Sequence, residues 1–344
     1  MASQKLTIIF LQTEAFGPAA YQNEKANSVF CVNRTLIVCI FPVLTPPWIN
    51  VSLTQQPGQS LHAIVERKRC FLEQHRWKTI PWALDTGPRP LALRLQDILC
   101  DTPGCFEDTQ TILINLARGH NVKNARKSLS DRVLVLVQQL YEIRWQWEEE
   151  FAHTCYEVTT ELSHTLCLDD GGCALFETVY YFRGILSAVN VANYNALLLL
   201  LHNVLNVLGV CQLGELIPPT LAGNPDKVNS TSTTSLILPG QGSCATAALE
   251  ICRVVDYCLL EEQDSLGALF LLFPLRVAHG ILCDSQPGTA RWVDNILKEI
   301  ANSKGFEIGG HILLQQTTPL DSTHTSVEPP SPLNVYSAVF LENS

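Results

Sequence analysis

Residues 243–308 read SCATAALEICRVVDYCLLEEQDSLGALFLLFPLRVAHGILCDSQPGTARWVDNILKEIANSKGFEI, and three helical patterns follow one another along them. In the first, apolar residues recur at i, i+3, i+4, i+7 and i+11 from Ala248 to Leu259, which is the spacing of one buried helix face. The opposite face is predicted to be polar and solvated, and it carries Glu250, Arg253 and Asp256.

The second pattern, residues 266–282, is apolar on nearly every side, which predicts a buried helix that starts or kinks at Pro274. The third follows QPGT at residues 286–289 and ends at Lys304-Gly305, where a cation and a glycine are typical of a helix terminus. Short connections between the three helices predict a compact helical unit.

Composition favours a large buried core over a nucleic-acid binder. The 344 residues are 47% hydrophobic and 16% charged, and their net charge is −10. A chain with this balance does not supply the cations that neutralise phosphates, so we expect no direct nucleic-acid binding. The densest basic cluster, Lys123, Arg126, Lys127 and Arg132, is interpreted as the solvated start of a helix.

The 13 cysteines are irregularly spaced and include no CxxC pair. A zinc cluster needs thiolates paired on tight turns, and an odd, irregular set is typical of reduced thiols in a core. We therefore expect no metal site and no cofactor.

Several helices are predicted upstream. Residues 91–99 predict one helix, Pro103-Gly104 a turn, and residues 106–116 a second helix. A long amphipathic helix is predicted to begin after a cap-like Ser128–Asp131 and to continue through Phe151. Its inward face carries Val133, Val137, Leu140, Tyr141, Trp147 and Phe151.

Residues 175–208 are the most apolar stretch, but asparagines recur throughout it. A membrane span prefers about 20 mostly apolar residues without so many amides, so one or two core helices of a bundle are expected. His202 lies in this stretch without an acidic residue or a second histidine at helical spacing, and it is interpreted as a hydrogen-bonded core histidine.

The predicted fold is all-α, an irregular multi-helix array with disordered or poorly ordered termini. Its predicted parts are an irregular segment without a zinc cluster at residues 1–65, a helical subassembly at 66–216, a flexible linker at 217–243, a second helical subassembly at 244–312, and a disordered tail at 313–344.

No catalytic motif emerges, so the chain is not expected to be an enzyme. Glu148, Glu149 and Glu150 point about 100° apart on a helix and do not converge on one ligand. They are interpreted as a solvated face. GxSxG, HExxH and a phosphate-binding GK[ST] loop are all missing from the sequence.

A family resemblance adds to these patterns. ALEICRVVDYCL, LGALFLLFPLRVA and RWVDNILKEIANSKGFEIG, together with the upstream RWKTIPWALDTGPRP, LYEIRWQWEEEF and LFETVYYFRGIL, resemble the carboxy-terminal helical region of fungal Zn2Cys6 transcription factors over residues 70–310. The resemblance implies a nuclear regulator that acts through other proteins, including full-length factors, or through self-association. The zinc cluster of that family has no counterpart in this sequence.

Three functions are carried forward. The first is a regulator that lacks a DNA-binding domain; the second is a helical small-molecule sensor or enzyme, favoured by a pocket beside His202 or Arg276. The third is a truncated or non-functional gene fragment. If the family resemblance is set aside, we expect a cytoplasmic location, and in either case we expect no membrane partner.

The candidate ligand- or partner-binding residues are Trp77, Trp82, His202, Arg253 and Arg276. Arg253 and Arg276 could instead pair with Asp256, Glu261 or Glu262.

Overall fold

The computed structural model describes residues 56–80, 87, 89–160, 175–212, 214–218 and 236–304. These residues are mostly helical, which confirms the predicted class. The predicted disordered tail and the first 55 residues lie outside the described residues. The helices are α3 (Gln56–Glu66), α4 (His75–Thr79), α5 (Leu91–Ala117), α6 (Lys123–Phe151), α7 (Ile185–Val207), α8 (Cys244–Arg253), α9 (Val255–Cys258), α10 (Asp264–Ser285) and α11 (Pro287–Lys304), with short 3-10 turns at Phe71–Glu73, Ala152–Thr154 and Glu261–Gln263.

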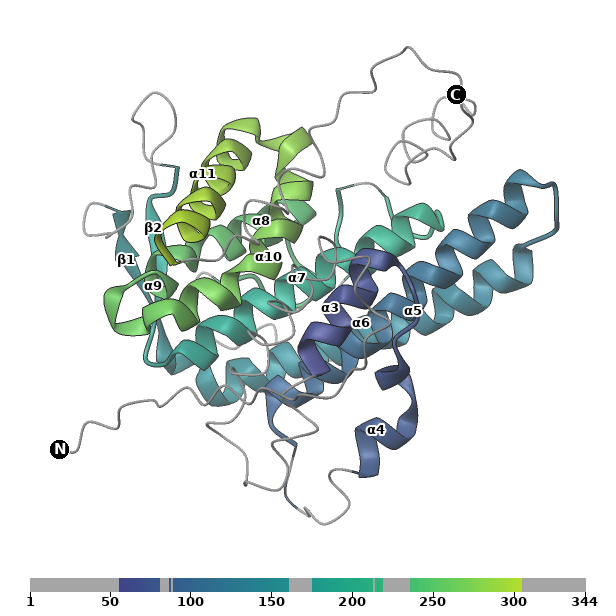
Figure 1. Ribbon diagram of the computed structural model, residues 1–344, viewed down its shortest axis with the longest axis horizontal. Coiled ribbons are helices and arrows are strands. Elements are labelled where there is room, and N and C mark those ends of the chain that lie inside the picture. Colours follow the sequence, from purple (N-terminus) through teal and green to yellow (C-terminus); the bar gives the residue numbers. More distant parts are fainter. Residues whose placement is uncertain are drawn as a thin grey trace, which may run out of the picture.

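Helix α7 is the central element. It packs against α5 and α6 and also against α8 and α10, so it lies between the α5–α6 hairpin and the α8–α11 group (Figure 1). One continuous apolar core joins all of these helices, with fully buried Leu140 of α6, Leu201 of α7, Ile251 of α8 and Leu275 of α10. The two predicted helical subassemblies therefore share a single core.

The predicted turn at Pro103-Gly104 is wrong, because α5 runs without interruption from Leu91 to Ala117. Proline removes one backbone donor from a helix. The residues on either side of Pro103-Gly104 make contacts typical of a helix interior: Thr102 donates to the Ile98 carbonyl at 2.8 Å and Cys105 to the Asp101 carbonyl at 3.6 Å. Gly104 leaves room for a neighbour, since a Cβ there would stand 2.7 Å from a carboxylate oxygen of Glu73.

The long amphipathic helix is confirmed, but it begins earlier than predicted. α6 starts at Lys123, whose backbone N–H donates to the Asn121 side chain, and the cap-like serines lie inside it. Ser130 donates to the Arg126 carbonyl at 2.9 Å, which is a helix-interior contact. The predicted inward face is buried except for Phe151, which is exposed at the end of the helix.

A small antiparallel hairpin was not predicted. Strand β1 (Cys155–Thr159) pairs with β2 (Thr178–Phe182), with Glu157 opposite Tyr180. Residues 175–182 therefore do not belong to a core helix, and only the remainder of that apolar stretch forms α7. Threonine, valine and tyrosine in TVYYF favour strand, and β2 gains a buried face by packing on α7, α8 and α9.

The carboxy-terminal helices follow the predicted pattern with three corrections. Ser243 caps α8 in a capping box with Thr246, and the helical stretch divides at Val254 into α8 and α9. Helix α10 passes through Pro274, so no helix starts there, and α11 begins at Pro287, within the QPGT that was predicted to precede it. At the amino-terminal side, α3 occupies residues 56–66, which corrects the irregular assignment over that part of residues 1–65.

Within the described ranges, two helices are long and apolar enough to cross a membrane, α7 and the Leu266–Ser285 part of α10. Both have neighbours within the bundle, since α7 contacts α5, α6, α8 and α10, and α10 contacts α8 and α11. This packing is what the sequence predicted for the apolar stretch that contains α7.

Candidate functional site

Trp77 lies on α4, half-buried on a small satellite core of Cys70, Leu72 and Cys100. Its ring meets Phe71 edge-on, with 5.4 Å between centroids. The indole therefore anchors the 70–79 segment on α5. Its Nε1 is buried without a hydrogen-bond partner in the part of the chain that the structure describes. Trp82, the other predicted tryptophan, lies outside the described residues.

Arg253 connects α8 to the β-hairpin. Its Cζ lies 3.8 Å from the centroid of the Tyr180 ring, Nε donates to the Thr178 carbonyl at 2.8 Å, and Nη2 lies 3.1 Å from Glu157. The sequence offered Asp256, Glu261 and Glu262 as acidic partners of Arg253, and the structure adds Glu157 of β1. Cation–π contact and an ion pair give Arg253 a role in positioning the hairpin.

Glu250 and Asp256 were predicted on a solvated helix face, and both are buried. The β1–β2 hairpin and α7 cover that face and supply hydrogen bonds of the kind that buried carboxylates need. Asn195 donates to Glu250 at 2.9 Å, the Ile237 N–H also donates to Glu250, and Tyr181 donates to Asp256 at 2.6 Å. Burial raises the pKa of Glu250, although the Ile237 hydrogen bond and the charge of Arg144 act to lower it.

Glu148 was also predicted to be solvated, but it is largely buried against Arg144, with 2.7 Å between Nη1 and Oε2. Arg144 in turn lies over the Trp147 ring at 4.9 Å. Glu149 and Glu150 are exposed as predicted. Covered faces of two helices thus hold buried charged groups, Arg144 and Glu148 on α6 and Glu250 on α8.

His202 is buried, as predicted, and its nearest partner is one that helical spacing could not reveal. Cys244, at the start of α8, places Sγ 3.0 Å from Nδ1 of His202, and Asn206 lies 3.2 Å from the same nitrogen. Burial lowers the pKa of His202 and raises that of Cys244 to about 11. Both shifts favour neutral forms, so the contact is a thiol–imidazole hydrogen bond and not an activated thiolate.

Arg276 lies on α10, where burial lowers the pKa of its guanidinium and Asp294 of α11 acts in the opposite direction. Asp294 of α11, which periodicity did not offer as a partner, therefore acts to keep this guanidinium charged. The four predicted site residues that the structure describes do not converge: Trp77, His202, Arg253 and Arg276 lie in different parts of the bundle. Among the described residues, no group of three or more His, Cys, Asp or Glu side chains is arranged to hold a metal ion.

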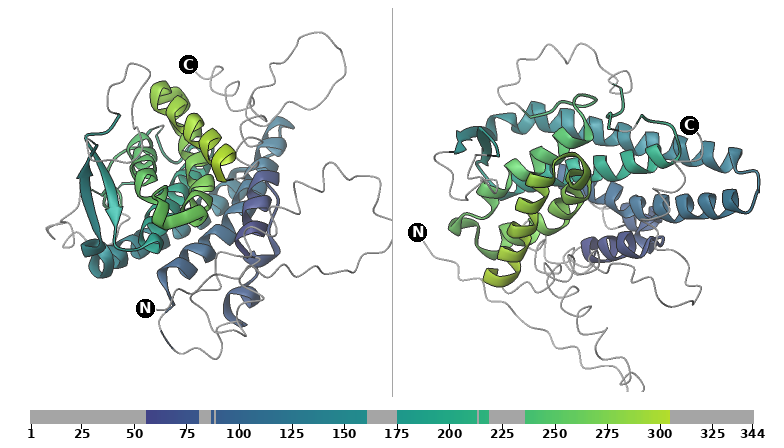
Figure 2. Two further views of the ribbon diagram at one scale, coloured as in Figure 1. Left: turned by 60° about the vertical axis from the view of Figure 1, so that its left-hand side comes forward. Right: turned by 90° about the horizontal axis from the view of Figure 1, so that it is seen from above.

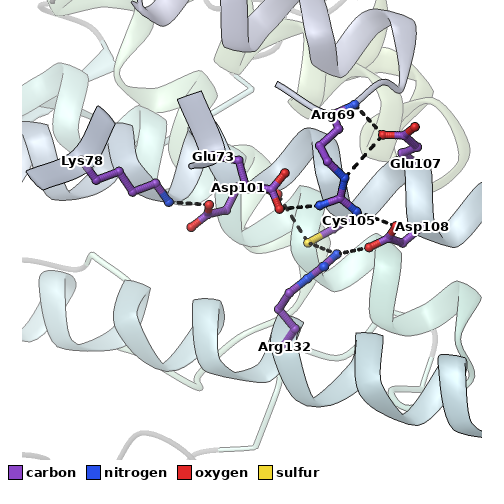
Figure 3. Close-up of polar contacts among 8 residues, drawn as sticks. All are labelled: Arg69, Glu73, Lys78, Asp101, Cys105, Glu107, Asp108 and Arg132. Carbon is purple, nitrogen blue, oxygen red and sulfur yellow. Dashed lines mark hydrogen bonds and ion pairs between the residues drawn. The ribbon is translucent and has the colours of Figure 1, made fainter. Parts of the chain in front are cut away.

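An ion network joins the segment before α4 to α5 and α6 (Figure 3). Arg69 donates to Glu73 at 2.5 Å and to Asp108 at 2.6 Å, and its backbone N–H donates to Glu107 at 2.7 Å. Arg132 of α6 donates to the other Asp108 oxygen at 2.6 Å. Burial acts to raise the pKa of Asp108, but the two arginines outweigh it and hold this pKa below its usual value. The charges satisfy one another, which indicates a structural clamp.

A cavity of about 170 Å³ lies between α5, α7 and α10. It is not beside His202 or Arg276, where the sensor hypothesis placed a pocket. Its walls are apolar apart from three amides, and the lining residues are Ala92, Leu95, Gln96, Leu99, Ile185, Leu186, Val189, Asn190, Asn193, Leu197, Leu266, Phe270 and Phe273.

The connected ends of α5 and α6, residues 114–127, project beyond the other helices (Figure 2). We call this segment the hairpin tip. It is rich in cations and contains no acidic residue, since Asp108 and Asp131 are the nearest acids in the sequence. The sequence prediction of a solvated helix start is confirmed for Lys123, Arg126 and Lys127, which are exposed.

Comparison of the chain with protein-family models, with curated proteins and with solved structures finds no match in any of the three. The resemblance to fungal Zn2Cys6 factors therefore stays a prediction, and a proposal for the function rests on the geometry of the chain itself.

Proposed function

We propose that the chain is a helical regulatory module that acts through contacts with other proteins, and that the hairpin tip is its docking surface for an acidic partner segment. The observation that carries the proposal is a projecting cationic tip on a chain whose net charge is −10. In a nucleus, as the family resemblance implies, acidic segments of full-length transcription factors have the required chemistry.

Arg126 of the tip donates Nε to the Leu208 carbonyl at 2.5 Å, but the tip itself supplies no carboxylate. Asp108 is already bonded to Arg69 and Arg132. Asp131 lies 3.9 Å from Lys127, and both side chains are largely exposed, so this pair contributes little. A cationic surface on an acidic chain steers acidic partners to one place and repels them elsewhere.

Apolar side chains favour a protein partner over a nucleic acid. Ile114 is 43% exposed and Leu116 is 53% exposed at the end of α5, beside the cations of the connection. Contacts with these apolar side chains add affinity for an amphipathic peptide segment, whereas a phosphate backbone has no apolar groups that could contact them.

A peptide titration tests the docking surface. The probe is a helical peptide of Glu and Leu, with a Lys–Leu peptide and a duplex DNA as competitors for the same surface. We expect the Glu–Leu peptide to bind the full chain, more weakly as salt rises, and the variant Arg118→Glu/Lys123→Glu/Lys127→Glu to lose about tenfold or more in affinity.

The matched control carries the same change of charge on other exposed cations, Lys68→Glu/Arg291→Glu/Lys298→Glu. It should keep most of the affinity. Equal losses in both variants would mean a non-specific charge effect, and duplex DNA bound at physiological salt through the tip would replace the proposal with nucleic-acid binding. The regulatory role is tested by fusing the chain to an unrelated DNA-binding domain: reporter transcription should change, and the tip variant should abolish the change. A fusion without effect on the reporter contradicts that role.

A further inference from the structure

We infer that the cavity between α5, α7 and α10 is a binding site for a small aromatic molecule that carries one hydrogen-bonding group. The site is independent of the hairpin tip. Helices far apart in the sequence enclose it: Ala92 and Leu99 on α5, Val189 and Leu197 on α7, and Phe270 and Phe273 on α10.

The size and lining of the cavity decide the class of ligand. An apolar cavity of about 150 Å³ accepts a benzene ring, and the cavity here, at about 170 Å³, is of the same order. Its walls are apolar apart from three amides, so an aromatic ring gains more dispersion contacts there than water does.

Three amides supply the polar selectivity. Asn190 and Asn193 lie at i and i+3 on α7, on the cavity side of the helix, and their side chains form no hydrogen bond with other described residues. Gln96 of α5 donates Nε2 to the Cys100 sulfur at 3.6 Å, and its Oε1 accepts no hydrogen bond from another described residue. A hydroxyl or ring N–H on the ligand would therefore meet amide groups whose hydrogen-bonding capacity is open.

The cavity also has an entrance. Leu186 on α7 and Leu266 on α10 line it and are each more than a third exposed. Side-chain rotations of two partly exposed leucines take place in nanoseconds, so a ligand can enter without unfolding of the bundle.

The test uses benzene, phenol and indole as probes, with calorimetric titration and thermal unfolding of the full chain. We expect all three to bind and to raise the Tm, and phenol to bind about 3- to 10-fold more tightly than its partition from water alone provides, because of the amide hydrogen bond. The absence of any heat or Tm shift with all three probes would overturn the inference.

Two variants locate the site. Ala92→Leu fills the cavity and should abolish binding, whereas Ala117→Leu, at the exposed end of the same helix, should bind as the parent does. Gln96→Leu/Asn190→Ala/Asn193→Ala removes all three amides, and it should remove the preference for phenol while benzene still binds. Binding that survives Ala92→Leu unchanged, or a phenol preference that survives the loss of the three amides, would place the probes elsewhere and refute the site.

Discussion

Asn195 on α7 donates its amide to Glu250 on α8, with 2.9 Å between Nδ2 and Oε2, and both side chains are buried. The second oxygen of Glu250 accepts the N–H of Ile237, in the segment that precedes α8. One carboxyl group thus ties α8 to the central helix and to its own incoming chain. Because burial is the largest influence on its pKa, this link depends on pH.

Glu250→Ala should lower the free energy of unfolding by about 2–6 kcal/mol, because two donors lose their acceptor and each costs about 1–3 kcal/mol. Glu250→Gln keeps an acceptor and should cost less than half of that. Urea unfolding at one pH measures both. An alanine variant as stable as the parent would mean that water replaces the carboxyl group.

The same carboxyl group predicts a pH dependence. Its pKa is higher in the folded chain than the ordinary value of 4.5, so the folded chain binds this proton more tightly than the unfolded chain does. The contribution of Glu250 to stability is therefore fully present below pH 4.5 and is lost as the pH rises towards the folded-state pKa.

Glu250→Gln does not titrate, so its stability relative to the parent should improve as the pH rises from 4.5 to 7.5. Unfolding free energies of both proteins across this range provide the measurement. A difference that is constant, or that changes in the opposite direction, would refute the assignment.

Two glycines of α10 should respond in opposite ways to alanine. A Cβ at Gly267 would stand 1.9 Å from the Cys258 carbonyl oxygen, so Gly267→Ala forces α9 and α10 apart and should cost about 1–3 kcal/mol or more. Gly280 is exposed with nothing within 4 Å of such a Cβ, and Gly280→Ala should stabilise the helix by about 0.5–1 kcal/mol. Thermal unfolding of the pair distinguishes packing from helix propensity, and a shared sign would contradict the packing of α10 on α9.

Two ion pairs on α6 have the same i, i+4 spacing and opposite surroundings. Arg144 and Glu148 are buried, so Arg144→Ala leaves a carboxylate without its partner and should cost about 3–5 kcal/mol. Lys127 and Asp131 are exposed, and Lys127→Ala should leave the free energy of unfolding unchanged within error. Chemical unfolding of the two variants measures the contrast. Equal losses would mean that α6 does not bury the first pair.

Thiol alkylation of the native chain reports the packing of the described cysteines. Cys283 is exposed and should react first, followed by the half-buried Cys211. Burial raises the pKa of Cys100 and of Cys105 to about 11, so both are neutral as well as covered and should react only on unfolding. Mass-spectrometric mapping of an iodoacetamide time course gives the order. Fast labelling of Cys105 would contradict the closure of the Arg69–Asp108–Arg132 clamp over α5.

Local sequence determined the helices and their apolar faces. A period of 3.6 residues explains the spacing from Ala248 to Leu259, the apolar run of α10 and the face from Val133 to Trp147. This period can be recognised from residues close together in the sequence. The same reasoning misplaced helix ends. Pro103 and the serines before Val133 are signals that packing overrode, since α5 and α6 gain more by continuing across each other than they lose at those residues.

Tertiary structure alone decided which polar residues are buried and which partners they bond to. Periodicity assigns Glu250, Asp256 and Glu148 to a helix face, but it cannot say that another element covers this face and supplies donors from Asn195, Tyr181 or Arg144. Cys244, which contacts His202, is 42 residues away from it in the chain, and Glu157 is 96 residues away from Arg253. The cavity walls come from three helices. Contacts of this kind depend on how helices are arranged in space, which the alternation of polar and apolar residues within a single helix does not encode.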